Sequence, residues 1–395
     1  MDTAIGTVYK PERVNLHNGW TGWIYREWKL PPELIRKWDS LSLTPGDTGI
    51  FISYGWFDLW WRAFGAGKQL FLVILKNAED IKAIFPCCIT APAAGGSEGA
   101  AISSMTNTHT CYYSFLIEPS VLREALSGFL ELLLKYAPHS QVRLEYLSEF
   151  RDTASTLTSE LKHHKFPYYH HTQPWAPWTK CSGDWTAFHD NLPGRLKNTL
   201  RRYRKKAGTQ GTLHFEAIER NEKLDDILNI VFDVEYNSWK GRNGTAVKCQ
   251  AEVEQFYRQL AHWAMGRNHL LLFILYLDNS PIAADFCLSF GHTVFLLKPG
   301  YNESFHYISP GNLLRFEVFD YLYKKQELRT YDFLGACDAW KMEWTQTCNR
   351  YGSIKIYPKS LQGWGEYMFQ YGWKDFLKKF RTARKVKSWL DRRGN

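Results

Sequence analysis

Residues 270–301 read LLLFILYLDNSPIAADFCLSFGHTVFLLKPGY, and this stretch decides the fold of the second half of the chain. It contains three apolar runs separated by two short polar turns, DNS and GHT. Such runs, joined by tight turns, predict an antiparallel meander of three strands. The segment that follows, SPGNLLRFEVFDYLYKK (309–325), predicts a helix with Pro310 in its first turn. This half is therefore predicted to be an α/β (α+β) unit.

The first half repeats this order of elements without repeating the residues. LFLVILK (70–76) and IKAIFPCCI (81–89) predict a hairpin, residues 121–136 predict a helix, and QVRLEYL (141–147) predicts a strand. We therefore expect two similar α/β halves, each a mixed, largely antiparallel sheet flanked by helices. PWAPW and CSGDW interrupt the pattern near residues 170–184 and suggest the boundary.

The sequence divides into three predicted regions, residues 1–175, 176–365 and 366–395. Two further helices are predicted, one over residues 185–207 and one over DAWKMEWTQTC (338–348). Residues 366–395 are predicted to form a basic amphipathic helix, because apolar residues recur there at three- and four-residue steps.

Length and composition limit the class of protein. The chain has 395 residues, of which 45% are apolar and 16% aromatic, so it can build the cores of about two domains. Its longest uninterrupted apolar run, residues 270–277, is far shorter than the ~20 residues that span a bilayer. The eight cysteines form no CxxC pair, which argues against a structural zinc site. Without a visible secretory signal, the sequence predicts a cytoplasmic protein with reduced thiols.

The positive charge is concentrated in two places. The net charge is +9, yet residues 195–206 hold seven Lys and Arg and no acid, and residues 374–395 contribute +7. The rest of the chain is therefore mildly acidic, which argues against a general nucleic-acid surface. The tail could pack on its own protein, or it could contact anionic lipid or a partner at the inner face of a membrane.

Several stretches, taken in order, resemble a known family. They are the aromatic helix that ends at Phe64-Gly65, LKNTLRRYRKKAG (196–208), the helix with Tyr236 and Trp239, LDNSPIAADFCLSFG (277–291), LLKPGYNESFHYISPGNLL (296–314) and YDFLGACDAWKMEW (331–344). The sequence resembles GNAT-superfamily acyltransferases of the CelD/BcsL type, which are related to the Fem aminoacyl transferases. The resemblance implies two tandem GNAT-like domains. One departure is visible: where the family has a Gly-Asp-Glu-Pro-Tyr-Lys-like run, residues 336–341 read ACDAWK and keep one acid of two.

The resemblance also implies a donor, acyl-CoA, and its site. In a GNAT-like fold the helix that follows the meander receives the coenzyme A pyrophosphate. A helix start suits an anion, because its free N–H groups and its dipole favour negative charge. The predicted donor site is therefore Ser309, Gly311, Asn312 and Leu313. The alternative is an ordinary capped helix with Ser309 as its N-cap.

Four residues are candidates for the chemistry, which requires a neutral amine and a protonated leaving thiolate. Asp285 lies in an apolar strand, so it is either paired or a general base with a raised pKa. Asp338 is the second candidate acid, and Lys341 could hold Asp338 or the acceptor, or form only a solvated ion pair with Asp338. Tyr301 is the candidate proton donor to the thiolate, although packing is the alternative for any tyrosine here.

The acceptor is expected to be an amine, either a small molecule or a peptide. Tyr236 and Trp239 could wall its groove or belong to the core. Arg201 and Arg202 could steer an anionic substrate or simply form a solvated face.

Three functions fit the sequence. The first is an acyl-CoA-dependent N-acyltransferase that works by direct attack in a ternary complex, without a metal. The second is a Fem-like transferase that uses aminoacyl-tRNA, in which residues 195–206 would contact phosphates. The third is a non-catalytic GNAT-like scaffold associated with a membrane or a partner.

Overall fold

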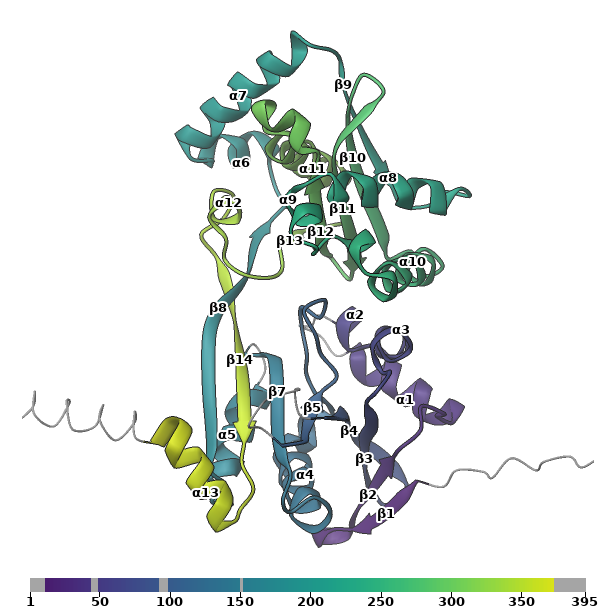
Figure 1. Ribbon diagram of the computed structural model, residues 1–395, viewed down its shortest axis with the longest axis vertical. Coiled ribbons are helices and arrows are strands. Elements are labelled where there is room, and N and C mark those ends of the chain that lie inside the picture. The colour runs from purple at the N-terminus through teal and green to yellow at the C-terminus, as the bar shows by residue number, and fades with distance from the viewer. Residues whose placement is uncertain (1–10, 44–48, 92–98, 150–151, 373–395) are drawn as a thin grey trace, which may run out of the picture.

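The computed structural model describes residues 11–43, 49–91, 99–149 and 152–372 (Figure 1). Its strands are β1 Glu12–Asn15, β2 Trp20–Tyr25, β3 Gln69–Asn77, β4 Asp80–Thr90, β5 Ala101–Ser104, β6 Leu116–Ile117, β7 Gln141–Ser148, β8 Tyr168–Lys180, β9 Leu213–Ile218, β10 Leu270–Leu277, β11 Ser280–Phe290, β12 Thr293–Tyr301, β13 Thr330–Asp332 and β14 Cys348–Ile356. Its α-helices are α1 Pro32–Ser42, α2 Gly49–Ile52, α3 Tyr54–Phe64, α4 Leu122–Tyr136, α5 Asp152–His163, α6 Trp185–Asn191, α7 Gly194–Gly208, α8 Leu224–Tyr236, α9 Trp239–Arg242, α10 Ala251–Met265, α11 Pro310–Lys325, α12 Ala339–Met342 and α13 Leu361–Tyr367. Short turns of other helix types are η1 His17–Gly19, η2 Pro119–Val121, η3 Val247–Cys249, η4 Glu303–Ile308 and η5 Met368–Gly372.

The structure has the two α/β halves that the sequence predicts, but their strands join in one mixed sheet, whereas a separate sheet was expected in each half. Thirteen of the described strands follow the order β1-β2-β3-β4-β5-β7-β14-β8-β13-β12-β11-β10-β9, and β6 pairs with β4. The predicted meander is β10-β11-β12, with antiparallel pairing throughout. The predicted first hairpin is β3-β4.

The repeat is visible in the topology. In the first half β5 leads into α4 and then pairs in parallel with β7, and in the second half β12 leads into α11 and then pairs in parallel with β13. Parallel neighbours need a crossover, and a helix supplies it in both halves. α4 and α11 are therefore equivalent elements.

β8 joins the two halves. Residues 168–177 pair with β14, and residues 178–180 pair with β13 (Figure 1). The PWAPW segment, which we expected to interrupt the structure, is thus part of a strand of 13 residues. β14 lies after the second half in the sequence but pairs with β7 of the first half. The domain boundary at residues 175 and 176 stays a prediction, since β8 crosses it.

Two helix predictions need correction. The single helix expected over residues 185–207 is two helices, α6 and α7, with Pro193 before the first residue of α7. Proline cannot donate the backbone hydrogen bond that a continuous helix needs there. The helix expected over residues 338–348 is the four-residue α12, and Cys348 already begins β14.

One hydrophobic core continues from the first half into the second. Phe51 of α2 packs against Phe295 of β12, with ring centroids 5.2 Å apart, and Trp56 of α3 packs against Phe256 of α10 at 5.6 Å. These residues belong to the same buried cluster. A second cluster lies in the second half, where strands β10 to β13 pack against α7 and α11. Burial of aromatic rings on this scale couples the stability of the two halves.

Within the described ranges, no helix is both long and apolar enough to cross a lipid bilayer. The predicted basic amphipathic helix begins as α13 and η5, but residues 373–395 lie outside the described residues. The predicted membrane contact through residues 374–395 therefore also lies outside them.

Candidate active site

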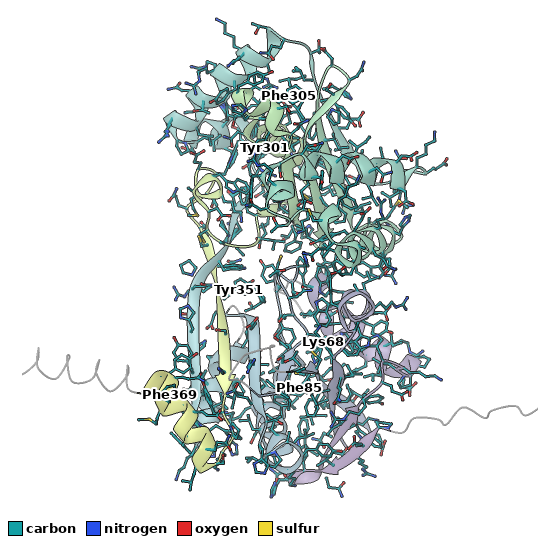
Figure 2. The ribbon with its side chains drawn as sticks, viewed as in Figure 1. Lys68, Phe85, Tyr301, Phe305, Tyr351 and Phe369 are labelled. Atoms are coloured by element: carbon teal, nitrogen blue, oxygen red, sulfur yellow. The ribbon has the colours of Figure 1, made fainter. Side chains whose placement is uncertain are left out.

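Strands β12 and β13 diverge at the centre of the second half. They pair only at residues 293–295 of β12, which lie opposite residues 330–332 of β13. β12 continues to Tyr301 along β11, with a register shift near Leu297. Figure 2 shows Tyr301 in the upper half of the molecule. The place where these two parallel strands diverge beside the start of α11, here called the opening, is the kind of position where α/β folds bind ligands.

The start of α11 is open, which the donor prediction requires. Ser309 adopts a left-handed conformation (φ 51°), and its carbonyl accepts from the N–H groups of Asn312 (3.1 Å) and Leu313 (3.2 Å). The Ser309 side chain does not cap the helix. Instead, the side-chain amide nitrogen of Asn312 donates to the Ser309 hydroxyl at 3.3 Å. In the described structure Gly311 N–H has no backbone partner. A Cβ added to Gly311 would meet only Tyr301 Cδ1, at 3.8 Å.

Basic residues of α7 lie beside this helix start. Lys206 lies over the Tyr307 ring at 5.0 Å, only a few residues before α11. Arg204 forms an ion pair with Glu317 of α11. Arg201 and Arg202, both exposed, continue the positive face outward. The site therefore combines the Gly311 N–H group at the start of a helix with a rim of basic side chains from α7, and both favour a phosphorylated ligand.

Asp285 is buried in an ion pair. Its exposure is 1%, and its carboxylate lies 2.8 Å from Nη1 and 3.2 Å from Nη2 of Arg315, which is 2% exposed and belongs to α11. Arg315 also donates to the Tyr331 hydroxyl of β13. Burial raises the pKa of Asp285, and the Arg315 guanidinium opposes that rise. The pair ties α11 to β11 and β13.

Asp338 and Lys341 form the ion pair that the sequence suggested, but Lys341 is buried. The Lys341 ammonium donates to the carbonyls of Leu334 and Ala336, both at 2.9 Å, and lies 3.0 Å from Asp338 Oδ2. Lys341 is 7% exposed, whereas the Asp338 side chain is half exposed. Three partners use the three N–H groups of an ammonium, so Lys341 has none left for an acceptor.

Tyr236 and Trp239 are exposed, at 49% and 47%, so the core-packing alternative does not apply to them. The turn between them contacts the start of η4, which follows β12, because Glu303 N–H donates to the Asn237 carbonyl at 3.1 Å. Arg242 adds a hydrogen bond to Glu303 at 2.9 Å. The structure therefore brings this aromatic pair close to the chain that follows Tyr301.

The sequence analysis missed Lys298 of β12. Its ammonium lies 5.1 Å from the centre of the Tyr257 ring, and no carboxylate lies within ion-pair distance of it among the described residues. Burial lowers the pKa of Lys298, and Lys240 lowers it further while Glu235 opposes the change. A lysine within the apolar run VFLLKPGY gave the same signal as Asp285 and could have been found in the same way.

Glu235 and Lys240 hold the end of β12. Lys240 donates to Glu235 Oε1 at 3.0 Å and to the Pro299 carbonyl at 2.6 Å. Glu235 Oε2 accepts from Val247 N–H at 2.9 Å. This buried network fixes β12 where it leaves β13, which is how a rigid opening is maintained.

The first half also contributes to the opening, a contribution that the sequence analysis did not predict. The Tyr112 hydroxyl donates to Asp332 at the end of β13, and the His109 ring packs edge-on against Tyr257, with centroids 5.8 Å apart. Burial raises the pKa of Asp332 well above its usual value and lowers that of His109 to about 4. Burial also raises the pKa of Cys111, the residue before Tyr112, to about 12.

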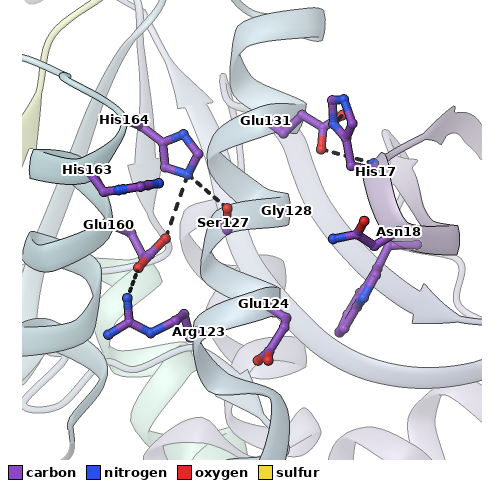
Figure 3. A pocket seen from close by; sticks show the side chains of 11 residues that line it. His17, Asn18, Arg123, Glu124, Ser127, Gly128, Glu131, Glu160, His163 and His164 are labelled. Carbon is purple, nitrogen blue, oxygen red and sulfur yellow. Dashed lines mark hydrogen bonds and ion pairs between the residues drawn. The ribbon is translucent and has the colours of Figure 1, made fainter.

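A separate cavity of about 280 Å³ lies in the first half, along α4 between η1 and α5 (Figure 3). The Ser127 hydroxyl is 2.8 Å from His164 Nε2, and Glu160 is 3.7 Å from the same nitrogen. In a nucleophilic triad the acid must hold the other ring nitrogen. The cluster is therefore not a catalytic triad, and it lies apart from the opening beside α11.

In the part of the chain that the structure describes, no group of three or more His, Cys, Asp or Glu side chains is arranged to hold a metal ion. None of the candidate residues above is thus assigned to a metal.

Comparison with known families gives a match within the second half. Residues 194–342 match the family model described as "Acetyltransferase (GNAT) domain". This range contains α7, the meander, α11 and α12, and so includes the opening described above. A search of curated proteins found no significant match.

Solved structures support the same fold at low sequence identity. A crystal structure of FemX has a TM-score of 0.55 at 9% identity, covering 82% of this chain and 96% of that one. A conserved protein of unknown function from Bacteroides thetaiotaomicron VPI-5482 has a TM-score of 0.52 at 9% identity, covering 85% and 99%. These likenesses span both halves, and they concern the fold alone.

Proposed function

We propose, on the premise that the protein is an acyltransferase with a GNAT domain at residues 194–342, that it transfers an acyl group from acyl-CoA directly to an amine. The observation that carries the proposal is the open start of α11. Among the described residues Gly311 N–H has no backbone partner, and it lies beside the diverging end of β12, where a pyrophosphate would meet this N–H group and the positive end of a helix dipole.

In this proposal Ser309, Gly311, Asn312 and Leu313 surround the pyrophosphate of coenzyme A. The left-handed Ser309 lies at the start of α11, and the Gly311 N–H group, which has no backbone partner among the described residues, is the backbone donor proposed for the phosphate. The basic rim of α7 attracts the remaining phosphate charge, because Lys206 lies against the turn that precedes the helix. The thioester then enters between β12 and β13.

Tyr301 and Asp338 are the proposed proton donor and acceptor. Tyr301 lies at the end of one diverging strand, beside Gly311, so its hydroxyl is suited to protonate the leaving sulfur. Asp338 follows the other strand, and its half-exposed carboxylate can take the proton of the attacking amine. Asp285 is engaged by Arg315, so its geometry favours holding α11 in place over removing a proton. Lys341 orients Asp338.

The acceptor is proposed to lie along Tyr236 and Trp239. Both rings are exposed, and the turn that carries them is bonded to the segment after β12. Exposed aromatic rings next to a reaction site commonly provide apolar walls for a substrate. A small amine or the amino group of a peptide would fit such a wall.

Gly311→Val tests the donor site. A valine side chain here would occupy the space proposed for the pyrophosphate. It would not clash with the protein itself, because the nearest atom to an added Cβ is 3.8 Å away. We expect acetyl-CoA affinity, measured by isothermal titration, to fall at least tenfold with little change in thermal stability. Gly194→Val is the matched control, because Gly194 also begins a helix and an added Cβ there meets nothing within 4 Å. Unaltered affinity in Gly311→Val would place the donor elsewhere.

A second candidate donor, aminoacyl-tRNA, is favoured by the outer face of α7. Arg201 and Arg202 are exposed, and among the described residues neither has an acidic partner. Adjacent cations on an exposed helix face are suited to a phosphate backbone. If tRNA is the donor, tRNA binding should weaken steeply with salt, and Arg201→Gln with Arg202→Gln should reduce the slope. If acyl-CoA is the donor, the double variant should keep its acetyl-CoA affinity within about threefold.

A further inference from the structure

The loop between β13 and β14 brings two cysteines into contact. Cys337 Sγ lies 2.9 Å from Cys348 Sγ, although eleven positions separate the two residues in the sequence. All eight cysteines of the chain lie in the described residues, and all are free thiols. Both members of this pair are partly exposed, whereas Cys87, Cys88, Cys181 and Cys287 are buried.

The backbone on both sides of the pair is fixed by β8. Ala336, which precedes Cys337, forms a β-bridge with Trp175, and Cys348 pairs with Pro177. Lys341 adds a bond to the Ala336 carbonyl at 2.9 Å. The backbone that carries the two sulfur atoms is therefore held in place by the fold. A disulfide requires sulfur atoms about 2.05 Å apart, so a shift of less than about 1 Å would close the bond.

We propose that Cys337 and Cys348 form a redox-active dithiol that a peroxide converts to a disulfide. In the first step the Cys348 thiolate attacks one oxygen of the peroxide. The O–O bond breaks, Cys348 becomes a sulfenic acid, and hydrogen peroxide releases its other oxygen as hydroxide, which takes up a proton to form water. In the second step Cys337 attacks the sulfenic sulfur, the S–S bond forms, the S–O bond breaks, and the hydroxyl group leaves with the Cys337 proton as a second water.

The order of the two steps follows from the surroundings of Cys337. Burial, together with the neighbouring Cys348 sulfur, raises the pKa of Cys337 to about 12, so its thiol is protonated at neutral pH. The Cys337 thiol also donates its hydrogen bond to the Cys348 sulfur, so Cys337 keeps its proton, and the first attack is assigned to Cys348, with Cys337 resolving the intermediate. The Met342 thioether, 3.6 Å from Cys348 Sγ, adds a third sulfur to the same place.

The disulfide would tie together the two ends of the segment that carries α12. This segment contains Asp338 and Lys341, so oxidation would restrain the residues next to the diverging strands. The dithiol itself depends only on the two cysteines and β8, and it goes beyond the proposed transferase activity.

Thiol counting on the full chain tests the proposal. Treatment of the native protein with hydrogen peroxide should lower the number of thiols titrated after denaturation from eight to six. A crosslinked peptide containing Cys337 and Cys348 should appear by mass spectrometry and vanish after reduction. Cys249→Ser, a control at another partly exposed cysteine, should still lose two thiols. Retention of all eight thiols, or a crosslink between other cysteines, would overturn the proposal.

Two variants test the order of the steps and the nature of the site. Cys337→Ser should accumulate a sulfenic acid at Cys348, which dimedone traps, whereas Cys348→Ser should not yield one at Cys337. Trapping at Cys337 instead would overturn the assigned order. If the purified protein held one copper or zinc ion per chain, lost in both Cys348→Ser and Met342→Leu, the three sulfur atoms would be a metal site and the dithiol proposal would fail.

Discussion

The buried pair of Asp285 and Arg315 is the most consequential contact at the level of single residues. Asp285→Asn would leave the Arg315 charge buried without a counter-charge, so we expect the free energy of unfolding to fall by about 3–5 kcal/mol. Urea denaturation followed by circular dichroism measures this change. A fully stable Asp285→Asn protein with strongly reduced turnover would instead support the general-base role.

The double variant Asp285→Leu with Arg315→Met separates the two roles. It removes both charges and keeps an apolar interior, so most of the lost stability should return. If Asp285 positions α11, acetyl-CoA affinity should recover as well. If Asp285 takes the proton, turnover should stay low in a stable protein.

His109 gives the protein a predictable pH dependence. Burial, aided by the nearby charge of Lys298, lowers the pKa of His109 to about 4, below the unfolded value of about 6.5. As the pH falls, His109 therefore binds a proton in the unfolded chain before it does so in the folded protein. The stability contributed by neutral His109 is present above pH 6.5 and is lost as the pH falls toward 4. We expect His109→Gln to remove up to about 2 kcal/mol of the difference in unfolding free energy between pH 7 and pH 5. An unchanged difference would mean that His109 is accessible to protons in the folded protein.

The candidate residues show what can be inferred from a sequence at this scale. A carboxylate among apolar residues marked Asp285 as unusual, but its partner lies 30 positions away on another element and left no local trace. Lys298 carried the same signal and was missed. Lys341 looked like one half of a surface ion pair, because nothing local shows that two carbonyls of the preceding loop would surround its ammonium.

At the level of elements, the loop before α12 depends on Lys341. Lys341→Met keeps the length of the side chain but removes the hydrogen bonds to Leu334 and Ala336, and it leaves both carbonyls without these donors. We expect a loss of about 2–4 kcal/mol in unfolding free energy. Asp338→Asn is the control, because it removes only a half-exposed ion pair and should cost less than about 1 kcal/mol. Equal losses in the two variants would contradict this account.

The strands were easier to predict than the connections between them. Alternation and tight turns located the meander and the first hairpin, because both are local. β8 was missed because its prolines suggest a break, and the structure explains why a strand tolerates them. Near Pro177 the strand changes partners from β14 to β13, and Ala176 has φ 51°, so a regular ladder of hydrogen bonds is not needed there.

For the molecule as a whole, the shared core predicts a single unfolding transition. Phe51 of the first half is fully buried against Phe295 of the second, with Trp56 and Tyr112 around it. Phe51→Ala should lower the unfolding free energy by about 3–5 kcal/mol and shift one calorimetric transition as a unit. Two separate transitions, with only one of them shifted, would show that the halves unfold independently.

The position of β14 also affects how the protein is made. β7 and β8 cannot pair with β14 until that strand has been synthesised, and β14 begins 168 residues after the last residue of β8. At typical rates of synthesis of 5–20 residues per second, the ribosome takes roughly 10–30 s to add that length. During that interval the nascent first half has two strand edges without their neighbour, and chaperones that bind such edges would have their longest opportunity to act.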